Sequence, residues 1–398
     1  MRDRKYYGRL RLTSFVTAFF LLLIATLSIV SCGKTATQPE QKKLSPQTME
    51  RLDKVLSKGM EVLKVPGAVA GVWVPGEGAW TAARGLADRD AGREMRTGDL
   101  FRIGSITKTF TATVVLQLVD EGQLSLDDTL DAYLPDVPHA GEITVRQLLN
   151  HTSGIWDDYG EKFMAVAQND MLKKWEPREL LEVTLAFDPD FKPGERFHYA
   201  NANYILAGMV IEQVTGNKLA GELQKRVFEP LELAHTSFAE GPEMSGDYSH
   251  GYTQEDPAAE PVDITGTMDP SMVWAAGAII SNLEDLEVWA PALARGELLS
   301  PRMQEERLTW VDAAPPESPG VDFRYGLGVS DDGGYIGHNG MFAGYNSSMF
   351  YLPSRDATLV VLLNNGTNPA YADLILIELA KVLFPDDIPQ HWEEASLE

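Results

Sequence analysis

The sequence predicts an α+β protein in which an antiparallel sheet is flanked by N- and C-terminal helices and carries an inserted all-helical lobe. Three observations support this prediction. Strand-like segments occur near both ends of the chain, and each terminal group of strands has an amphipathic helix beside it, whereas the middle of the chain reads as helices and long loops. Strands from the two ends must therefore share one sheet, and the first and last helices must lie on it.

The N-terminal part of the domain begins with a helix. Residues 48–64 carry apolar residues at intervals of three or four, which gives one buried stripe. These residues are Met49, Leu52, Leu56, Met60 and Leu63. Two strands follow at 69–74 and 79–85, separated by the turn Pro75-Gly76-Glu77-Gly78.

The helical lobe begins at Ser105. Residues 105–121 have an apolar side chain at every fourth position, and Gly122 follows as a C-terminal stop. The apolar positions are Ile106, Phe110, Val114 and Leu118. Helices and long loops continue to about residue 265 and include helices at 178–186 and 203–214.

The chain then returns to strands at 335–337, 344–351 and 358–363, and it closes with a helix over 371–383. We therefore expect one domain over 48–384 and a C-terminal tail over 385–398. Its α/β lobe comprises about 48–104 and 270–384, and its helical lobe about 105–269. A functional site is expected in the cleft between these lobes.

Ser105 and Lys108 are a candidate nucleophile and base. On a helix, residues three apart lie on one face with Cβ atoms about 5–6 Å apart. A serine hydroxyl is a weak nucleophile unless a neighbour takes its proton, and burial would lower the pKa of Lys108 enough for that task. Ser-x-x-Lys is common by chance, so a capping serine and a solvated lysine are the alternative. A second match, Ser31 to Lys34, falls in the targeting segment.

Tyr199-Ala200-Asn201 is a candidate acid/base and substrate-binding motif. A tyrosine near a lysine can protonate a leaving amine or alkoxide, and an asparagine amide can both donate and accept hydrogen bonds. Asn203 lies close by, so the choice of asparagine stays open. A half-buried tyrosine without chemistry is the other interpretation.

His338-Asn339-Gly340 is the third candidate motif. Glycine lets a ligand approach the backbone, and an edge strand here would offer the N–H of Met341, together with that of Ser105, as an oxyanion hole. His139 and Gly141 have the same spacing but precede the tyrosine motif. A histidine in a strand or turn without chemistry remains the alternative.

In this order, the three motifs resemble those of the penicillin-recognising serine hydrolases, the superfamily of class C β-lactamases and D-alanyl-D-alanine carboxypeptidases. Other segments between about 48 and 384 are also similar to segments of that superfamily. They are Phe101-Arg102-Ile103-Gly104, Leu148 to Ile155, Pro193-Gly194, Ala275-Ala276-Gly277 and Arg324 to Gly328. The resemblance implies a β-lactamase/transpeptidase-like fold.

The resemblance also implies residue roles. Ser105 would be the acylated nucleophile, Lys108 its proton acceptor, Tyr199 the acid/base for the leaving group, and Asn201 the residue that holds the substrate amide. His338 stands where many relatives have lysine, and it is positively charged only when protonated.

Four further residues would belong to the substrate site by this resemblance. Asn339 replaces a threonine that helps to bind a substrate carboxylate in relatives, and Gly340 and Met341 continue the same strand. Arg324 is a candidate carboxylate clamp, because guanidinium binds carboxylate with two hydrogen bonds. Trp274 is a candidate wall of the pocket, with a core tryptophan as the alternative. His151 is interpreted as structural support for a loop.

The N-terminus reads as an export signal. Residues 1–31 hold five basic residues, one acid and an apolar stretch from Leu12 to Val30. Ile29-Val30-Ser31-Cys32 resembles a lipobox, and Cys32 is the only cysteine, which favours lipidation and a tether over 32–47. An uncleaved membrane anchor is the alternative. We expect an exported lipoprotein on the periplasmic or cell-surface face.

Composition and spacing exclude several functions. The formal net charge is −24, and it would be −28 without residues 1–31, which is unfavourable for nucleic acid. The seven histidines have no metal-binding spacing, so we expect neither a metal nor another cofactor. A Gly-x-Ser-x-Gly elbow is missing, which argues against the common esterase fold.

The favoured hypothesis is an exported serine acyl hydrolase of the D-alanyl-D-alanine carboxypeptidase type that acts on a peptidoglycan peptide or a small acyl substrate. An esterase or β-lactamase on the same scaffold is an alternative within the enzymes. A receptor that binds penicillin or wall peptides without hydrolysing them is the alternative from a different class.

Overall fold

The computed structural model describes residues 42–155, 161–185, 188–256, 258–315, 318 and 320–397. Within these residues, nine strands form one antiparallel sheet, and residues 41–398 make up one compact unit. The strand order is β3 (Arg93–Glu94), β2 (Gly78–Asp88), β1 (Gly67–Val74), β14 (Ala357–Leu363), β13 (Tyr345–Leu352), β12 (Tyr335–Phe342), β11 (Ser330–Asp332), β10 (Phe323–Tyr325) and β9 (Val311–Asp312).

Strands from the two ends of the chain meet at the centre of this sheet. β1 pairs with β14 from Ala68 opposite Leu363 onward, and the N–H of Gly67 donates to Oδ1 of Asn364 at 2.6 Å. Both strands are buried along their whole length, which explains why they read as nearly continuous apolar runs.

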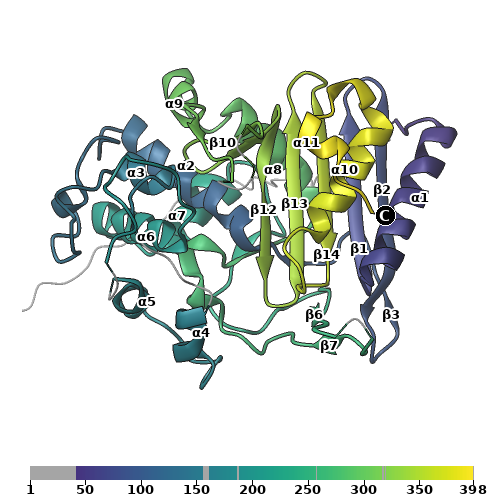
Figure 1. Ribbon diagram of the computed structural model, residues 1–398, viewed down its shortest axis with the longest axis horizontal. Coiled ribbons are helices and arrows are strands. Elements are labelled where there is room, and N and C mark those ends of the chain that lie inside the picture. The colour runs from purple at the N-terminus through teal and green to yellow at the C-terminus, as the bar shows by residue number, and fades with distance from the viewer. Residues whose placement is uncertain are drawn as a thin grey trace, which may run out of the picture. The chain divides into compact units, whose positions relative to one another are not determined.

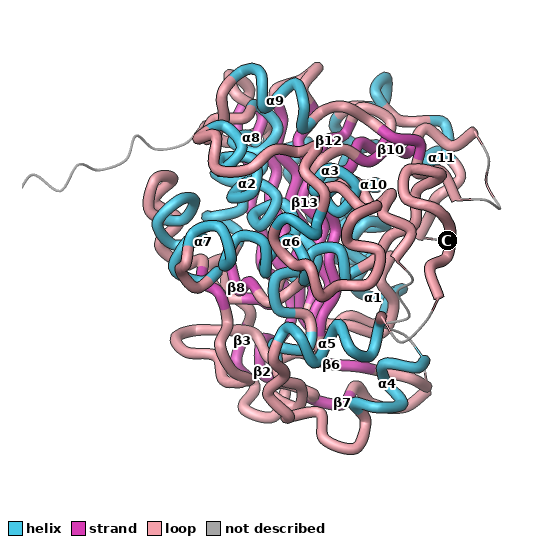
Figure 2. Tube along the Cα trace, turned by 90° about the vertical axis from the view of Figure 1, so that its left-hand side faces the viewer, coloured by secondary structure: helices cyan, strands magenta, loops and turns pink. Residues whose placement is uncertain are grey.

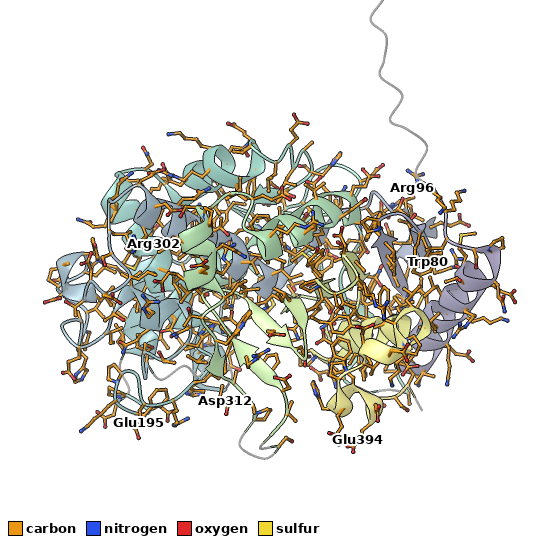
Figure 3. The ribbon with its side chains drawn as sticks, turned by 90° about the horizontal axis from the view of Figure 1, so that it is seen from above. Trp80, Arg96, Glu195, Arg302, Asp312 and Glu394 are labelled. Atoms are coloured by element: carbon orange, nitrogen blue, oxygen red, sulfur yellow. The ribbon has the colours of Figure 1, made fainter. Side chains whose placement is uncertain are left out.

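Helices cover both faces of the sheet (Figure 1). α1 (Pro46–Leu63) and α10 (Tyr371–Leu383) pack together on one face, where their apolar stripes share one buried cluster with the strands. Trp80 of β2, labelled in Figure 3, donates to Asp53 of α1 at 3.3 Å. The other face packs against α8 (Leu283–Arg295). The predicted sheet with flanking terminal helices is thus confirmed.

The helical lobe lies toward the viewer in Figure 2. α2 and α6 pack against each other at its centre, and both are buried on nearly every side. Its helices are α2 (Thr107–Asp120), α3 (Val145–Leu149), α4 (Glu161–Ala167), α5 (Pro177–Thr184), α6 (Asn201–Thr215) and α7 (Leu219–Leu223). α9 (Pro301–Arg307) follows α8, and five short strands occur between β3 and α8: β4 (Phe101–Arg102), β5 (Ser237–Phe238), β6 (Tyr252–Thr253), β7 (Val262–Asp263) and β8 (Ile279–Ser281).

β12 is longer than the sequence indicates. The prediction ends a strand at residue 337, but β12 continues to Phe342 and contains the whole His338-Asn339-Gly340 motif. Asparagine and glycine are poor strand formers. The strand persists because β13 pairs with it residue by residue up to Phe342 opposite Tyr345, across a turn in which Ala343 and Gly344 both have positive φ.

The segment predicted as a C-terminal tail also packs on the sheet. It contains α11 (Gln390–Glu393), whose Trp392 is buried against Tyr335 with ring centroids 4.4 Å apart. The predicted export signal, Cys32 and most of the tether lie outside the described residues. Within the described residues, no helix is both long and apolar enough to cross a membrane.

Candidate active site

Ser105 lies in a short 3₁₀ turn, Gly104–Ile106, that leads directly into α2. Lys108 follows one turn later, and its side chain is completely buried. Nζ of Lys108 lies 3.0 Å from Oγ of Ser105. The helix therefore brings the predicted nucleophile and its predicted proton acceptor into hydrogen-bond contact.

Two other acceptors lie close to Nζ of Lys108. Oδ1 of Asn201 is 2.8 Å away and the carbonyl oxygen of Ala276 is 2.9 Å away. The ring of Tyr199 also faces Lys108, with Nζ 4.8 Å from its centroid. The structure thus brings the serine, lysine, tyrosine and asparagine of the first two motifs together.

Asn201, the first residue of α6, is the asparagine that contacts Lys108. Asn203 serves a different purpose, because it bonds to the hydroxyl of Ser153 at 2.6 Å and to the ring of His151 at 3.2 Å. Of the two asparagines, Asn201 is therefore the one in contact with Lys108.

His151 holds the loop that presents Tyr199. Its carbonyl oxygen accepts from the N–H of His198 at 2.9 Å, and its Nδ1 accepts from the N–H of Ala200 at 3.1 Å. These bonds fasten the backbone on both sides of Tyr199, whose ring centroid lies 4.3 Å from that of His151. Burial lowers the pKa of His151 well below its usual value, so the ring stays neutral and can accept at Nδ1. This geometry agrees with a structural role for His151.

A stretch of β12 forms the opposite side of the site. β11 pairs with β12 only as far as Gly337, and the Gly104–Ile106 turn packs beside the remainder. A Cβ on Gly340 would lie 2.1 Å from the carbonyl oxygen of Ile103, and a Cβ on Gly104 would lie 2.5 Å from the nitrogen of Met341. The two backbones can approach this closely only because both residues are glycine. The nitrogens of Ser105 and Met341 are thus held near each other, as an oxyanion hole requires.

His338 is buried in β12 and is not a cation at neutral pH. Its Nδ1–H donates to the carbonyl oxygen of Asn339 at 2.5 Å, so its Nε2, 2.9 Å from the hydroxyl of Tyr325, accepts from it. Burial, reinforced by the charge of Lys108, lowers the pKa of His338 to about 3. The position that carries lysine in many relatives is therefore neutral here.

Asn339 is held by Asp373, a residue that the sequence did not single out. Nδ2 of Asn339 donates to Oδ2 of Asp373 at 2.6 Å, and the hydroxyl of Ser348 donates to Oδ1 of the same carboxylate at 2.6 Å. Ser348 stands directly opposite Asn339 in the sheet. Burial raises the pKa of Asp373 to about 6. The only sequence signal was an acid in the first turn of an apolar helix, which usually indicates a favourable interaction with the helix dipole.

Two cavities meet at Tyr199 and Asn339. The first, about 520 Å³, contains Ser105, Asn201 and the backbone of Gly340 and is mainly apolar elsewhere. Its apolar lining includes Phe163, Met268, Met272, Val273, Met341 and Pro369. The second, about 220 Å³, lies beside Tyr199 and contains His338, Asp332 and Asp373. A larger cavity of about 640 Å³ lies in the helical lobe and contains none of the predicted site residues.

Two predicted binding residues do not line either cavity at Tyr199. Arg324 is paired with Asp331 through Nη2, because β10 directs its side chain away from the neighbouring Tyr325, which does line the second cavity. Trp274 packs on α6, where a Cβ on Gly208 would lie 2.8 Å from its ring. The carboxylate clamp and the tryptophan wall of the sequence analysis therefore have no support in this geometry.

Within the part of the chain that the structure describes, no cluster of three or more His, Cys, Asp or Glu side chains is arranged to hold a metal ion. A serine, a buried lysine and a tyrosine beside two backbone nitrogens suit acyl transfer from a carbonyl carbon to Oγ of Ser105.

A comparison with family models gives one match, to the β-lactamase family, over residues 52–383. The chain belongs to the β-lactamase family. A curated relative in this group is penicillin-binding protein 4* of Bacillus subtilis, which is 27% identical over 323 residues, covering 77% of this chain and 70% of the relative. Esterase EstB of Burkholderia gladioli is 34% identical over 200 residues, covering 47% of this chain and 51% of the esterase.

Among solved structures, a D-stereospecific amidohydrolase from a Streptomyces species superposes with a TM-score of 0.72 at 34% identity. The superposition covers 85% of this chain and 98% of the amidohydrolase. The chain is therefore a serine hydrolase of the β-lactamase and penicillin-binding protein family. Esterases, amidases and penicillin-binding proteins on this scaffold share a serine site, so the family alone does not fix the substrate.

Proposed function

We propose that this β-lactamase family member hydrolyses an amide bond on the carboxyl side of a D-alanine-type residue through an acyl-enzyme at Ser105. The observation that carries the proposal is the 3.0 Å contact between Ser105 and the buried Lys108, beside Tyr199. The D-configuration is supported by the similarity to the D-stereospecific amidohydrolase. The D-alanyl-D-alanine peptides expected from the sequence belong to this substrate class.

The reaction proceeds in two halves. Nζ of Lys108 accepts the hydroxyl proton while Oγ of Ser105 attacks the carbonyl carbon, and the N–H groups of Ser105 and Met341 stabilise the oxyanion. The C–N bond then breaks as Tyr199 protonates the departing amine. Tyr199, now deprotonated, takes a proton from water as the water oxygen attacks the Ser105 ester. The C–Oγ bond then breaks, Lys108 returns its proton to Oγ of Ser105, and the acid is released.

Acylation of Ser105 is the first test of this function. Intact-mass measurement should detect one covalent adduct per chain, an acyl group from a fluorescent penicillin or a phosphonyl group from a fluorophosphonate, and none on Ser105→Ala. A wild-type chain that is never labelled would overturn the acyl-enzyme. A penicillin label that stays for hours, without turnover of any amide or ester, would favour the receptor hypothesis.

Esterase or β-lactamase activity is the second candidate, favoured by the 34% identity to EstB and by the apolar lining of the cavity. Turnover of an N-acylated D-alanyl-D-alanine peptide and its C-terminal amide, a short nitrophenyl ester and a chromogenic cephalosporin by the purified chain separates the amidase, esterase and β-lactamase activities. Hydrolysis of the ester alone would reject the amidase.

We also propose that the chain acts outside the cytoplasm on wall peptides, anchored through a lipid on Cys32. This proposal rests on the sequence of residues 1–32. Cys32→Ser should move the protein from the membrane to the soluble fraction, whereas Ser31→Ala should not. Continued membrane association of Cys32→Ser would support an uncleaved anchor instead.

A further inference from the structure

We propose that Asp373 fixes the amide of Asn339 so that the site accepts a leaving group ending in an uncharged, N–H-bearing group and rejects one ending in a carboxylate. This inference rests on the proposed function and specifies its substrate. It separates a D-amidase or endopeptidase from a carboxypeptidase, whose leaving group carries a free carboxylate.

The hydrogen bonds around Asp373 determine how the Asn339 amide is oriented. An ionised carboxylate only accepts hydrogen bonds, so the group of Asn339 that lies 2.6 Å from Oδ2 of Asp373 must be the amide nitrogen. The side-chain oxygen of Asn339 then lies on the other side of the amide from Asp373, where it can accept a hydrogen bond. Because Asn339 lines both the Ser105 cavity and the neighbouring one, the edge of the site gains a hydrogen-bond acceptor there.

Asn201 shows the opposite arrangement on the other side of Tyr199. There the lysine holds the amide oxygen, with Nζ of Lys108 2.8 Å from Oδ1, so the Asn201 nitrogen is turned away from the lysine. Lys108 thus holds the oxygen of Asn201, whereas Asp373 holds the nitrogen of Asn339. A substrate amide has an N–H that can donate to the oxygen of Asn339, whereas a carboxylate has acceptors only.

The charges around Asn339 also disfavour a carboxylate. His338 is neutral, and the guanidinium of Arg324 is paired with Asp331. Among the described residues, no Lys, Arg or His lies within 4.0 Å of the Asp373 carboxylate, although His391 pairs with Asp332 in the second cavity at 2.5 Å. A substrate carboxylate placed beside Asn339 would therefore meet an unneutralised negative charge.

Two peptides that differ only at the terminal group test this inference. At pH 7.5, kcat/KM for N-acetyl-D-alanyl-D-alaninamide should exceed that for N-acetyl-D-alanyl-D-alanine by about tenfold or more. Asp373→Asn removes the charge and frees the Asn339 amide to turn, so this ratio should fall at least about fivefold. Glu378→Gln, the same change in charge on the same helix, is the control and should leave the ratio within about twofold.

For the wild type, the ratio of kcat/KM for the amide peptide to that for the carboxylate peptide should also fall between pH 7.5 and pH 5. Burial raises the pKa of Asp373 to about 6, and the protonated acid no longer holds the Asn339 amide in one orientation. This measurement decides the matter if Asp373→Asn fails to fold. If Ser105 is acylated but neither peptide turns over, the same ratio is read from inhibition of that acylation by each peptide.

Three results would overturn the inference while leaving the acyl-enzyme intact. They are a wild-type preference for the carboxylate peptide, an equal loss on both peptides in Asp373→Asn, and a ratio that stays constant with pH. The second would mean that Asp373 only fastens α10 to the sheet. Absence of any acylation of Ser105 would instead remove the proposed function itself.

Discussion

The catalytic cavity has a helical wall, made of Ser105, Lys108, Tyr199 and Asn201, and a strand wall, made of residues 338–342 of β12. The helical wall contains a buried lysine, and Ser105, Lys108, Tyr199 and Asn201 lie in contact there. The strand wall has a neutral histidine in place of a lysine and an asparagine held by an acid. The helical wall therefore keeps the residues that the family resemblance predicts, whereas the strand wall departs from the predicted pattern at His338 and Asn339.

This difference teaches that acylation and substrate choice are separable in this structure. In the proposed reaction the helical wall would act on the carbonyl that every amide, ester and lactam possesses, so it should tolerate little change. The strand wall would contact the part of the substrate that varies. Substitutions in the two walls should accordingly have effects of different size and kind.

Lys108→Ala should produce the largest effect. Removal of the proton acceptor should slow acylation of Ser105 by about 10³-fold or more, measured by stopped-flow labelling. Lys218→Ala, which removes an exposed lysine, is the control. Lys108→Met, which better fills the buried space, should be as slow as Lys108→Ala while melting closer to the wild type. Near-normal labelling of either variant would remove Lys108 from the mechanism.

Gly340→Ala should follow, because it pushes the two walls apart. Its Cβ would lie 2.1 Å from the carbonyl oxygen of Ile103 and 2.7 Å from the nitrogen of Ser105. A displacement of about 1 Å at the oxyanion hole should lower kcat about 100-fold for amide and ester alike. Gly221→Ala, whose Cβ would meet no atom within 4 Å, is the matched control. Wild-type turnover by Gly340→Ala would place the oxyanion site elsewhere.

His338→Gln should have the smallest effect, on acid stability. The folded chain keeps His338 neutral down to a pKa of about 3, whereas the unfolded chain protonates it near 6.5, so acid favours unfolding between these values. Asp373, whose pKa is raised, opposes this trend between about pH 6 and 4. Between pH 7.5 and 4.5, the free energy of unfolding of the variant should therefore fall by about 2–3 kcal/mol less than that of the wild type. Parallel melting curves for both proteins at the two pH values would show that His338 does not titrate this way.

Local patterns were sufficient to predict the helical wall. The four-residue apolar spacing after Ser105 placed Lys108 on a buried helix, and the second helix, predicted at 203–214, begins at Asn201 in the structure. The sheet and both terminal helices could be predicted as well, because strands buried on both faces leave apolar runs. The motif order then connected the two parts of the site.

The side-chain contacts of the strand wall could not be predicted, because no local sequence pattern encodes them. Asp373 reaches Asn339 only because β13 and β14 return the chain to the same sheet face, 34 residues later. Arg324 could bind a carboxylate, but its guanidinium is paired with Asp331. Trp274 packs over Gly208 of α6 instead of lining the cavity. Side-chain partners of this kind are decided by tertiary packing, which residue types and spacing do not specify.

The pairing of β1 with β14 has a consequence for how the molecule is made. The sheet joins Ala68 to Leu363, so its central seam cannot close until nearly the whole polypeptide has left the ribosome. Contacts of such long sequence separation slow folding and leave apolar segments exposed in the meantime. A chain that stays open until its last helix is synthesised would need holdase protection, and shortening it from the C-terminal end should yield insoluble fragments rather than smaller working enzymes.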